Sequence, residues 1–465
     1  MSPLFLVLAC EPPVGTDTDA PVDSGGDSGQ VEGPVSMAPG DVVDMDVADD
    51  GTVSIELSDT GNYIVILASM AMGQGQFHGY GDNAAAASRT LPPGTLPALP
   101  PDNRPPRSAA AVGEERTFSV YDGSSYVTVT GRVTTVSEMV TVWEDITTPN
   151  QLGGIDETVI DAVIANLEGH VIPRERQVFG EESDVDANGT IDILVSYTVN
   201  EYGAVAYVTQ CDIGEVSGCG SRGNGGEIVY LGVPDPEDPY GTPAGITETV
   251  AHELNHLIYG WHKYIAQGQP DVAENIYLTE GMSALALDLT GYNNGNQYVW
   301  AAALDATDYL GSEATIDSVS VNDFLRGTSY YDVQRDGPLR GAAYLYLRYL
   351  FEQAGGMSVG GDGTLVDEGG MAWLHDWFDT PELGPDTIPA TTGREVEDVS
   401  MDFFTALVVS GRVQNDNPAY NFQERVVDPV TGYEFGVEMY ALIHGWLQLE
   451  GPELQKFGRN DGELR

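Results

Sequence analysis

The sequence predicts a multidomain protein, in which a β-sandwich-like domain precedes an α+β domain that ends in a helical C-terminal lobe. Short runs of alternating apolar and polar residues fill positions 37–145, and a helical period of apolar residues begins after Gln151. Beyond Gly291 the strongest segments are helical in pattern. A chain of 465 residues has room for roughly two to four such units.

The composition is strongly acidic, with 72 Asp and Glu residues against 19 Lys and Arg residues and a formal net charge of −53. Such a surface repels nucleic acid and anionic lipid, so we expect no nucleic-acid partner. It suits a protein that works in salt or calcium, since both screen carboxylates. Simple solubility explains part of the charge equally well.

The first ten residues, MSPLFLVLAC, resemble the end of a bacterial lipoprotein signal, although no Lys or Arg precedes the apolar run. We therefore expect residues 1–10 to be the remnant of a signal, with a lipid on Cys10 as the single contact with a membrane. The alternative is an incidental cysteine in a disordered tail. Residues 11–36 are mostly Gly, Asp, Ser, Thr and Pro, which predicts a disordered acidic tether. These features favour a bacterial cell-surface or outer-membrane lipoprotein, or a secreted protein.

The β-rich pattern of residues 37–145 predicts an accessory domain. Its runs VVDMDV, TVSIEL, NYIVILASM, TFSVYD, YVTVTGRV and EMVTVWED alternate with turn signals. A proline-rich stretch at about 84–113 predicts an exposed insert in this domain. Nothing in the domain indicates a chemistry of its own.

Residues 151–291 read as an α+β half, and residues 292–465 as the helical lobe. Apolar residues recur on one face of a helix from Ile160 to Leu167, and the strand patterns DILVSY and GEIVYLGV follow. Thr242 and Pro243 look like an N-cap and a first helical residue, and Gly260 can end that helix. The lobe is represented by GPLRGAAYLYLRYLFEQAGG, MAWLHDWFD and VSMDFFTALVVSG.

Cys211 and Cys219 remain as an even pair if Cys10 carries a lipid. They flank a short loop that contains glycine, and they can close a disulfide in an oxidising compartment. The alternative is two free thiols.

The stretch from Thr247 to Asp288 carries the chemistry. It places His252, Glu253 and His256 in an HExxH array, and Glu280 follows within LTEG. Two imidazoles at i and i+4 share one helix face and can hold one zinc ion. A glutamate on a second helix completes a set of two histidines and one carboxylate, with a fourth position open. The alternative is a helix with two incidental histidines.

HELNH followed by LTEGMSALALDL resembles the gluzincin zinc metallopeptidases, and most of all the hyicolysin-type secreted bacterial enzymes. The resemblance implies a zincin-like, thermolysin-like catalytic domain over roughly 155–411. It implies His252, His256 and Glu280 as zinc ligands and Glu253 as the general base that activates the zinc-bound water. The chain departs from the family motif Leu-Asn-Glu-Gly at Thr279.

Gluzincins also supply a tyrosine or histidine to stabilise the oxyanion of the reaction. By position, the candidates here are Tyr330 and Tyr331, with His375 behind them. Asp288 is a candidate for orienting a zinc-bound imidazole. Zincins bind substrate along an edge strand, for which 203–209 is the candidate, and we expect no ligation from His262.

A second motif predicts a calcium site. The loop D-x-D-x-N-G-x-x-D alternates oxygen side chains around a glycine that permits a sharp turn, and Thr190 can add its backbone carbonyl. Position twelve is Val195, so the loop does not follow the EF-hand pattern. The alternative is an acidic turn that binds no ion. The expected ligands are Asp184, Asp186, Asn188, Thr190 and Asp192.

These features favour a zinc endopeptidase that acts on extracellular proteins or peptides as a monomer, with Zn²⁺ and Ca²⁺ as cofactors. A second hypothesis is a catalytically silent, calcium-binding surface lipoprotein, used for adhesion or as a scaffold, on a peptidase fold. A third is a zinc hydrolase that acts on something other than peptides. The presence of all four residues His252, Glu253, His256 and Glu280 favours the first.

Overall fold

A computed structural model describes most of the chain between residues 110 and 436, together with three strands near the N-terminus. Tyr330, Tyr331 and the greater part of the expected tether and proline-rich insert lie outside the described residues. The described ranges are 4–11, 41–46, 62–69, 110–150, 152, 156–237, 239–291, 321–325, 336–410, 415–423, 425–430, 432 and 434–436.

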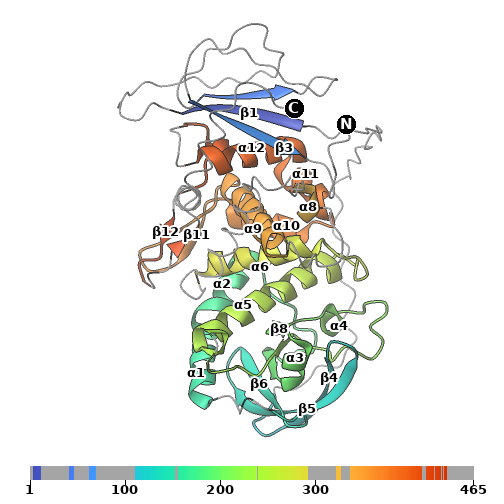
Figure 1. The fold of residues 1–465 in the computed structure, drawn as a ribbon. Coiled ribbons are helices and arrows are strands. Elements are labelled where there is room, and N and C mark those ends of the chain that lie inside the picture. The colour runs from blue at the N-terminus through green and yellow to red at the C-terminus, as the bar shows by residue number, and fades with distance from the viewer. Residues whose placement is uncertain are drawn as a thin grey trace.

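The central element is a mixed, curled sheet of six strands in the order β4-β5-β6-β7-β9-β8 (Figure 1). Strands β4, β5 and β6 pair antiparallel, β7 is parallel to both β6 and β9, and the short β8 is antiparallel to β9 at one edge. The strands are β4 (Glu115–Tyr121), β5 (Tyr126–Val136), β6 (Val140–Asp145), β7 (Ile191–Val195), β8 (Ala206–Tyr207) and β9 (Ile228–Leu231).

This sheet corrects the expected boundary after Asp145. Strands β4 to β6 were expected in a separate β-sandwich-like domain, but β6 pairs with β7 of the following half. The reason is burial: Val142 packs against the helices on one face of the sheet and Trp143 in a second cluster that includes Phe118. A strand buried on both faces takes neighbours on both sides, which a sequence pattern of alternation does not reveal.

The N-terminal strands form a separate sheet in the order β2-β1-β3. Strand β1 (Leu4–Glu11) contains Cys10 and lies between β2 (Val42–Asp46) and β3 (Asn62–Ser69). The apolar run that predicts a signal is therefore paired as a strand in this structure. A short apolar segment suits either role, so the pattern alone does not separate them.

Helices cover one face of the six-stranded sheet. The longest, α5 (Pro243–Gly260), begins at the N-cap Thr242, whose side-chain oxygen accepts a hydrogen bond from Gly245 N at 3.1 Å. Its apolar stripe, which includes Val250 and Leu254, is buried. The others are α1 (Glu157–Asn166), η1 (Leu167–Val171), α2 (Ile172–Phe179), α4 (Gln210–Ile213), η2 (Pro239–Gly241) and η3 (Trp261–Ile265). The short helix α3 (Tyr197–Tyr202) instead places Val199 in the second cluster, with Trp143 and Phe118.

A mostly helical lobe packs on the opposite side of α5 (Figure 1), and it begins with α6, which was expected in the preceding α+β half. Its helices are α6 (Ile276–Thr290), α8 (Val321–Leu325), α9 (Asp336–Gln353), α10 (Gly370–Asp379), η4 (Gly384–Asp386), α11 (Thr387–Thr392), α12 (Val396–Val409) and η5 (Pro418–Tyr420). Two small hairpins accompany them, β10 (Met357–Val359) with β11 (Leu365–Asp367), and β12 (Val426–Val427) with β13 (Glu434–Phe435).

In the described part of the chain, helices long enough to cross a bilayer are not sufficiently apolar to do so.

Candidate metal centre

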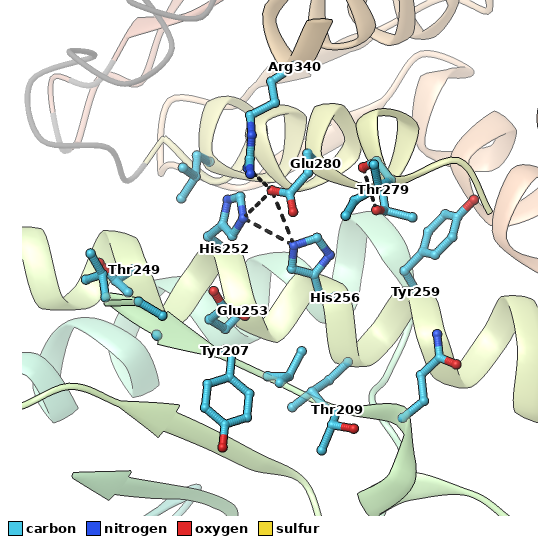
Figure 2. Close-up of a pocket in the computed structure, with 18 of the residues that line it drawn as sticks. Tyr207, Thr209, Thr249, His252, Glu253, His256, Tyr259, Thr279, Glu280 and Arg340 are labelled. Atoms are coloured by element: carbon cyan, nitrogen blue, oxygen red, sulfur yellow. Dashed lines mark hydrogen bonds and ion pairs between the residues drawn. The ribbon is translucent and has the colours of Figure 1, made fainter. Parts of the chain in front are cut away.

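Two neighbouring helices bring the expected zinc ligands together. His252 and His256 lie one turn apart on α5, and Glu280 faces them from α6 (Figure 2). His252 Nε2 lies 3.1 Å from Glu280 Oε2 and 3.2 Å from His256 Nε2. His256 Nε2 lies 3.7 Å from the same carboxylate oxygen.

These three atoms fit a zinc ion. Zinc–ligand bonds of about 2.0–2.1 Å in a tetrahedron place neighbouring ligand atoms about 3.3 Å apart. The observed separations of 3.1, 3.2 and 3.7 Å surround that value. The donor set of two imidazoles and one carboxylate is the set that catalytic zinc sites use, with a position left open.

The metal centre depends on a close approach between α6 and α9. A Cβ atom placed on Gly281 would lie 2.6 Å from Ala343 Cβ and 2.8 Å from its carbonyl carbon. Glycine at this position of the LTEG motif therefore allows α9 to pack tightly beside Glu280. The packing brings Arg340 of α9 into an ion pair with Glu280 Oε2.

Arg340 was not foreseen from the sequence. It lies 60 residues beyond Glu280, and no short spacing links the two. Arg340 also lines the cavity beside the metal ligands. The signal in the sequence is a cationic residue within a mostly apolar helical segment, GPLRGAAYLYLRYLFEQ. Arg348 lies in the same segment, so this signal does not single out Arg340.

The charges in the site favour an ionised Glu280. Burial alone would raise the pKa of Glu280, but nearby His256 and the hydrogen bonds with both imidazoles hold this pKa well below its usual range. Burial would lower the pKa of His256, but Glu280 raises it. The carboxylate and the two imidazoles are thus a complementary set of charges.

Glu253 lies beside this set, as the HExxH array predicts. Its side chain is 9% exposed and lines the same cavity as the three ligands. Burial raises the pKa of Glu253, and the attraction of His256 and His252 opposes that shift without cancelling it. A carboxylate with a raised pKa is suited to taking up and returning a proton.

Ser283, rather than Asp288, contacts a ligand ring. Ser283 Oγ lies 3.2 Å from His256 Nδ1, the nitrogen opposite the one that faces Glu280. The expected orienting residue, Asp288, accepts hydrogen bonds from Arg348 at 2.7 Å and Tyr344 at 3.1 Å. Asp288 lies eight residues beyond Glu280, which turns its side chain off the face that meets α5. The prediction for Asp288 was wrong.

A cavity of about 550 Å³ opens next to the metal ligands. One wall is the segment 204–210, which contains β8, and the opposite wall includes Thr279, Glu280 and Arg340. Figure 2 shows Tyr207 and Thr209 below α5 and the ligands above them. The expected substrate strand 203–209 therefore lies at the sheet edge and beside the cavity.

Other histidines lie apart from this centre. His262 lies beyond α5, where its Nδ1 pairs with Asp379 at 2.9 Å and its Nε2 with the Glu181 carbonyl at 2.9 Å. His375 is exposed on α10 and does not line the cavity. The oxyanion candidates Tyr330 and Tyr331 lie outside the described residues.

The two cysteines that were expected to pair form a disulfide. Cys211 and Cys219 are joined across a separation of eight residues, with Cα atoms 5.7 Å apart. Cys211 belongs to α4, directly after Gln210, which lines the cavity.

The expected calcium loop is partly assembled. Oxygen atoms of Asp184 and Asp186 lie within 4.8 Å of each other and of an oxygen of Glu227, a residue that the motif does not contain. Asn188 Oδ1 instead accepts a hydrogen bond from Thr190 N at 2.6 Å. Asp192 is buried in β7 and pairs with Arg116 at 3.2 Å, so it does not belong to this group.

Comparisons with known proteins add little. No protein-family model matches the sequence, and no curated protein matches it. Among the solved structures that match is a mutant M1 zinc metallopeptidase from Deinococcus radiodurans, with a TM-score of 0.30 and 14% identity, over 66% of this chain and 54% of that one. The chain spans about half the length of that peptidase.

Proposed function

We propose that this chain is a zinc-dependent endopeptidase of the gluzincin type that hydrolyses peptide bonds of extracellular proteins. The convergence of His252 Nε2, His256 Nε2 and Glu280 Oε2, with Glu253 beside them in one cavity, carries the proposal. A zinc ion held by the three ligands would supply a Lewis acid for the reaction.

The protein's own residues divide the remaining work. Glu253 acts as the general base, taking a proton from the attacking water and delivering it to the leaving amine. The edge strand β8 binds the substrate backbone along the cavity wall. Arg340 keeps a positive charge beside Glu280.

A metal analysis paired with a cleavage assay tests the proposal. We expect about one zinc per chain and chelator-sensitive cleavage of casein. Glu253→Ala should retain zinc and lose about 10²- to 10⁴-fold in rate, because only the proton transfer is removed. Glu138→Gln, an exposed carboxylate, is the matched control and should cleave normally.

Other outcomes decide against the proposal. Bound zinc without cleavage of any protein substrate favours the silent calcium-binding lipoprotein, whereas cleavage of esters or amidated sugars alone favours another zinc hydrolase. If the purified chain binds no zinc, both the zinc endopeptidase and the other zinc hydrolase are excluded.

The proposed enzyme acts as a monomer at the bacterial cell surface, tethered by a lipid on Cys10. The lipoprotein-like MSPLFLVLAC and the acidic composition support this location. Fatty-acid labelling of Cys10 and size-exclusion chromatography test the anchor and the monomer.

A further inference from the structure

Three carboxylates meet at one end of the strands β7 and β9, apart from the proposed zinc ligands. One oxygen each of Asp184, Asp186 and Glu227 lies within 4.8 Å of the others. We propose that these residues form a binding site for a calcium ion, which joins the loop before β7 to the first residues of β9. The proposal does not rest on the peptidase activity.

Glu227 provides the observation that points to a ligand. Its side chain is 2% exposed, and its Oε1 accepts hydrogen bonds from Ser183 Oγ at 2.5 Å and Val185 N at 3.1 Å. Its Oε2 is buried and has no hydrogen-bond partner among the residues that the structure describes. A buried carboxylate oxygen without a partner is costly, and a cation removes that cost.

The negative charges of Asp184, Asp186 and Glu227 also favour a bound cation. Burial raises the pKa of Glu227 to about 8, and the negative charges of Asp186 and Asp184 add to that shift. Arg116 forms an ion pair with Asp192, and Arg176 forms one with Glu182. Three carboxylates that share one small space are stable together when a positive ion lies among them.

The ligand chemistry selects calcium. All the side-chain donors are oxygens, which suits a hard cation and not zinc. Asp186 is buried and Asp184 is exposed, so the site has a closed and an open side. Calcium accepts six to eight oxygens in irregular geometry and can complete its shell with water on the open side, whereas magnesium demands a near-ideal octahedron.

The location gives the ion a structural task. Glu227 directly precedes β9, which pairs with β7 on one side and with the edge strand β8 on the other. A calcium ion bound here fixes the start of β9 to the loop 184–190. Calcium therefore stabilises the sheet next to the cavity wall.

Thermal unfolding of zinc-loaded protein, with and without calcium, tests the site. The Glu253→Ala background prevents self-cleavage. We expect saturating calcium to raise Tm by about 5 °C or more, while sodium chloride of equal ionic strength does not.

Glu227→Gln supplies the decisive comparison. The amide oxygen retains an acceptor for Ser183 and Val185, so Tm without calcium should stay equal or rise, and the calcium-induced increase should disappear. Asp184→Asn, at an exposed position, should lose the increase as well and serves if the first variant does not fold. The control Glu181→Gln removes an exposed carboxylate near the loop and should keep the full increase.

Two results would overturn the site. One is a calcium-induced increase that survives in Glu227→Gln and Asp184→Asn, because surface carboxylates would then explain it. The other is the absence of a saturable increase in the parent protein. Glu280→Gln should lose zinc and keep the calcium response, so failure of the zinc site and failure of the calcium site are distinguishable.

Discussion

Ser283 holds the position that orients a ligand ring. Its hydroxyl lies 3.2 Å from His256 Nδ1 and is fully buried, so it fixes the ring while Nε2 faces Glu280. Partners of this kind set the tautomer and orientation of a metal-bound imidazole.

Ser283→Ala should therefore weaken zinc binding by about tenfold, because the ring loses its orienting partner. Competition with a chelating dye measures the affinity, and excess zinc should restore much of the cleavage. The control is Ser400→Ala, which removes a buried hydroxyl on a different helix, α12, and should leave zinc affinity unchanged. Equal zinc affinity in both variants would contradict the assigned role.

Glu175 of α2 is a buried acid whose two carboxylate oxygens have no hydrogen-bond partner in the described part of the chain. Burial raises the pKa of Glu175 well above its usual value, and Glu182 adds to the shift. The folded protein thus favours the protonated form. Its contribution to stability is complete below the unfolded pKa and is lost as pH rises through the folded pKa.

Glu175→Gln should remove this pH dependence. We expect the variant to be more stable than the parent at pH 8, by about 1–3 kcal/mol, and similar to it near pH 4. Urea unfolding at several pH values measures the difference, with exposed Glu138→Gln as the control. A variant that is less stable at pH 8 would show that the buried carboxyl has a stabilising partner.

The residues that the sequence predicted well are those with local spacing. His252, Glu253 and His256 lie within one turn and a half of α5, and Glu280 lies on the next long helix. Arg340 and Glu227 were not predicted, because their positions depend on packing between distant elements. Arg340 reaches its place through the packing of α9 on α6, and Glu227 through the pairing of β9 with β7. Asp192 was misassigned because a strand residue alternates faces, and its pairing with Arg116 depends on β4.

At the scale of elements, β8 presents its backbone to the cavity side of the sheet. Gly232 N donates to Val205 O at 2.8 Å, and Ala206 lies opposite Leu231. In an antiparallel pair, bonded positions alternate with positions whose N–H and C=O point outward. Ala206 is one of the outward positions, at the free edge of the sheet order.

Ala206→Pro should thus remove one backbone donor from the proposed substrate-binding edge and leave the ladder to β9 in place. Loss of one such hydrogen bond costs about 0.5–1.5 kcal/mol, so kcat/KM should fall by about two- to tenfold. Ala206→Gly retains the N–H and serves as the control. Unchanged kcat/KM in the proline variant, with Tm also unchanged, would place the substrate elsewhere.

The elements themselves were predictable where one pattern dominates. The N-cap at Thr242 and the apolar stripe of α5 gave the correct helix start and its buried face. The alternation in EMVTVWED predicted the strand β6 but not its partner, since each residue of the parallel neighbour β7 lies 51 positions after the residue it pairs with, as Ile191 does after Val140. Pairing between distant strands is a property of the whole sheet.

At the scale of the molecule, buried ion pairs join distant parts of the chain around α6. Arg174 of α2 pairs with Asp428 at 2.5 Å, and Asp288 of α6 accepts from Arg348 of α9 and from Gly436 N at 2.7 Å. Breaking such buried pairs leaves a charge uncompensated. The segment between Asp428 and Gly436 is thus fastened to α2 and to α6, the helix that carries Glu280.

The proposed anchor is also a property of the whole molecule. Expressed in a bacterium with labelled palmitate, the wild-type protein should incorporate label, and Cys10→Ser should not, because only a cysteine accepts the lipid. Cys211→Ser in combination with Cys219→Ser is the control and should still be labelled. If the wild-type protein is not labelled, Cys10 carries no lipid, and the result favours β1 as a structural strand of the N-terminal sheet.

The pairing of β6 with β7 also limits where a protease can trim the chain. A cut after Asp145 that released the preceding segment would strip β4, β5 and β6 from the sheet and expose Val142 and Trp143. Losing those strands removes the hydrogen bonds along one side of β7 as well as its packing. Removal of an N-terminal piece that leaves the sheet intact is therefore confined to positions before Glu115.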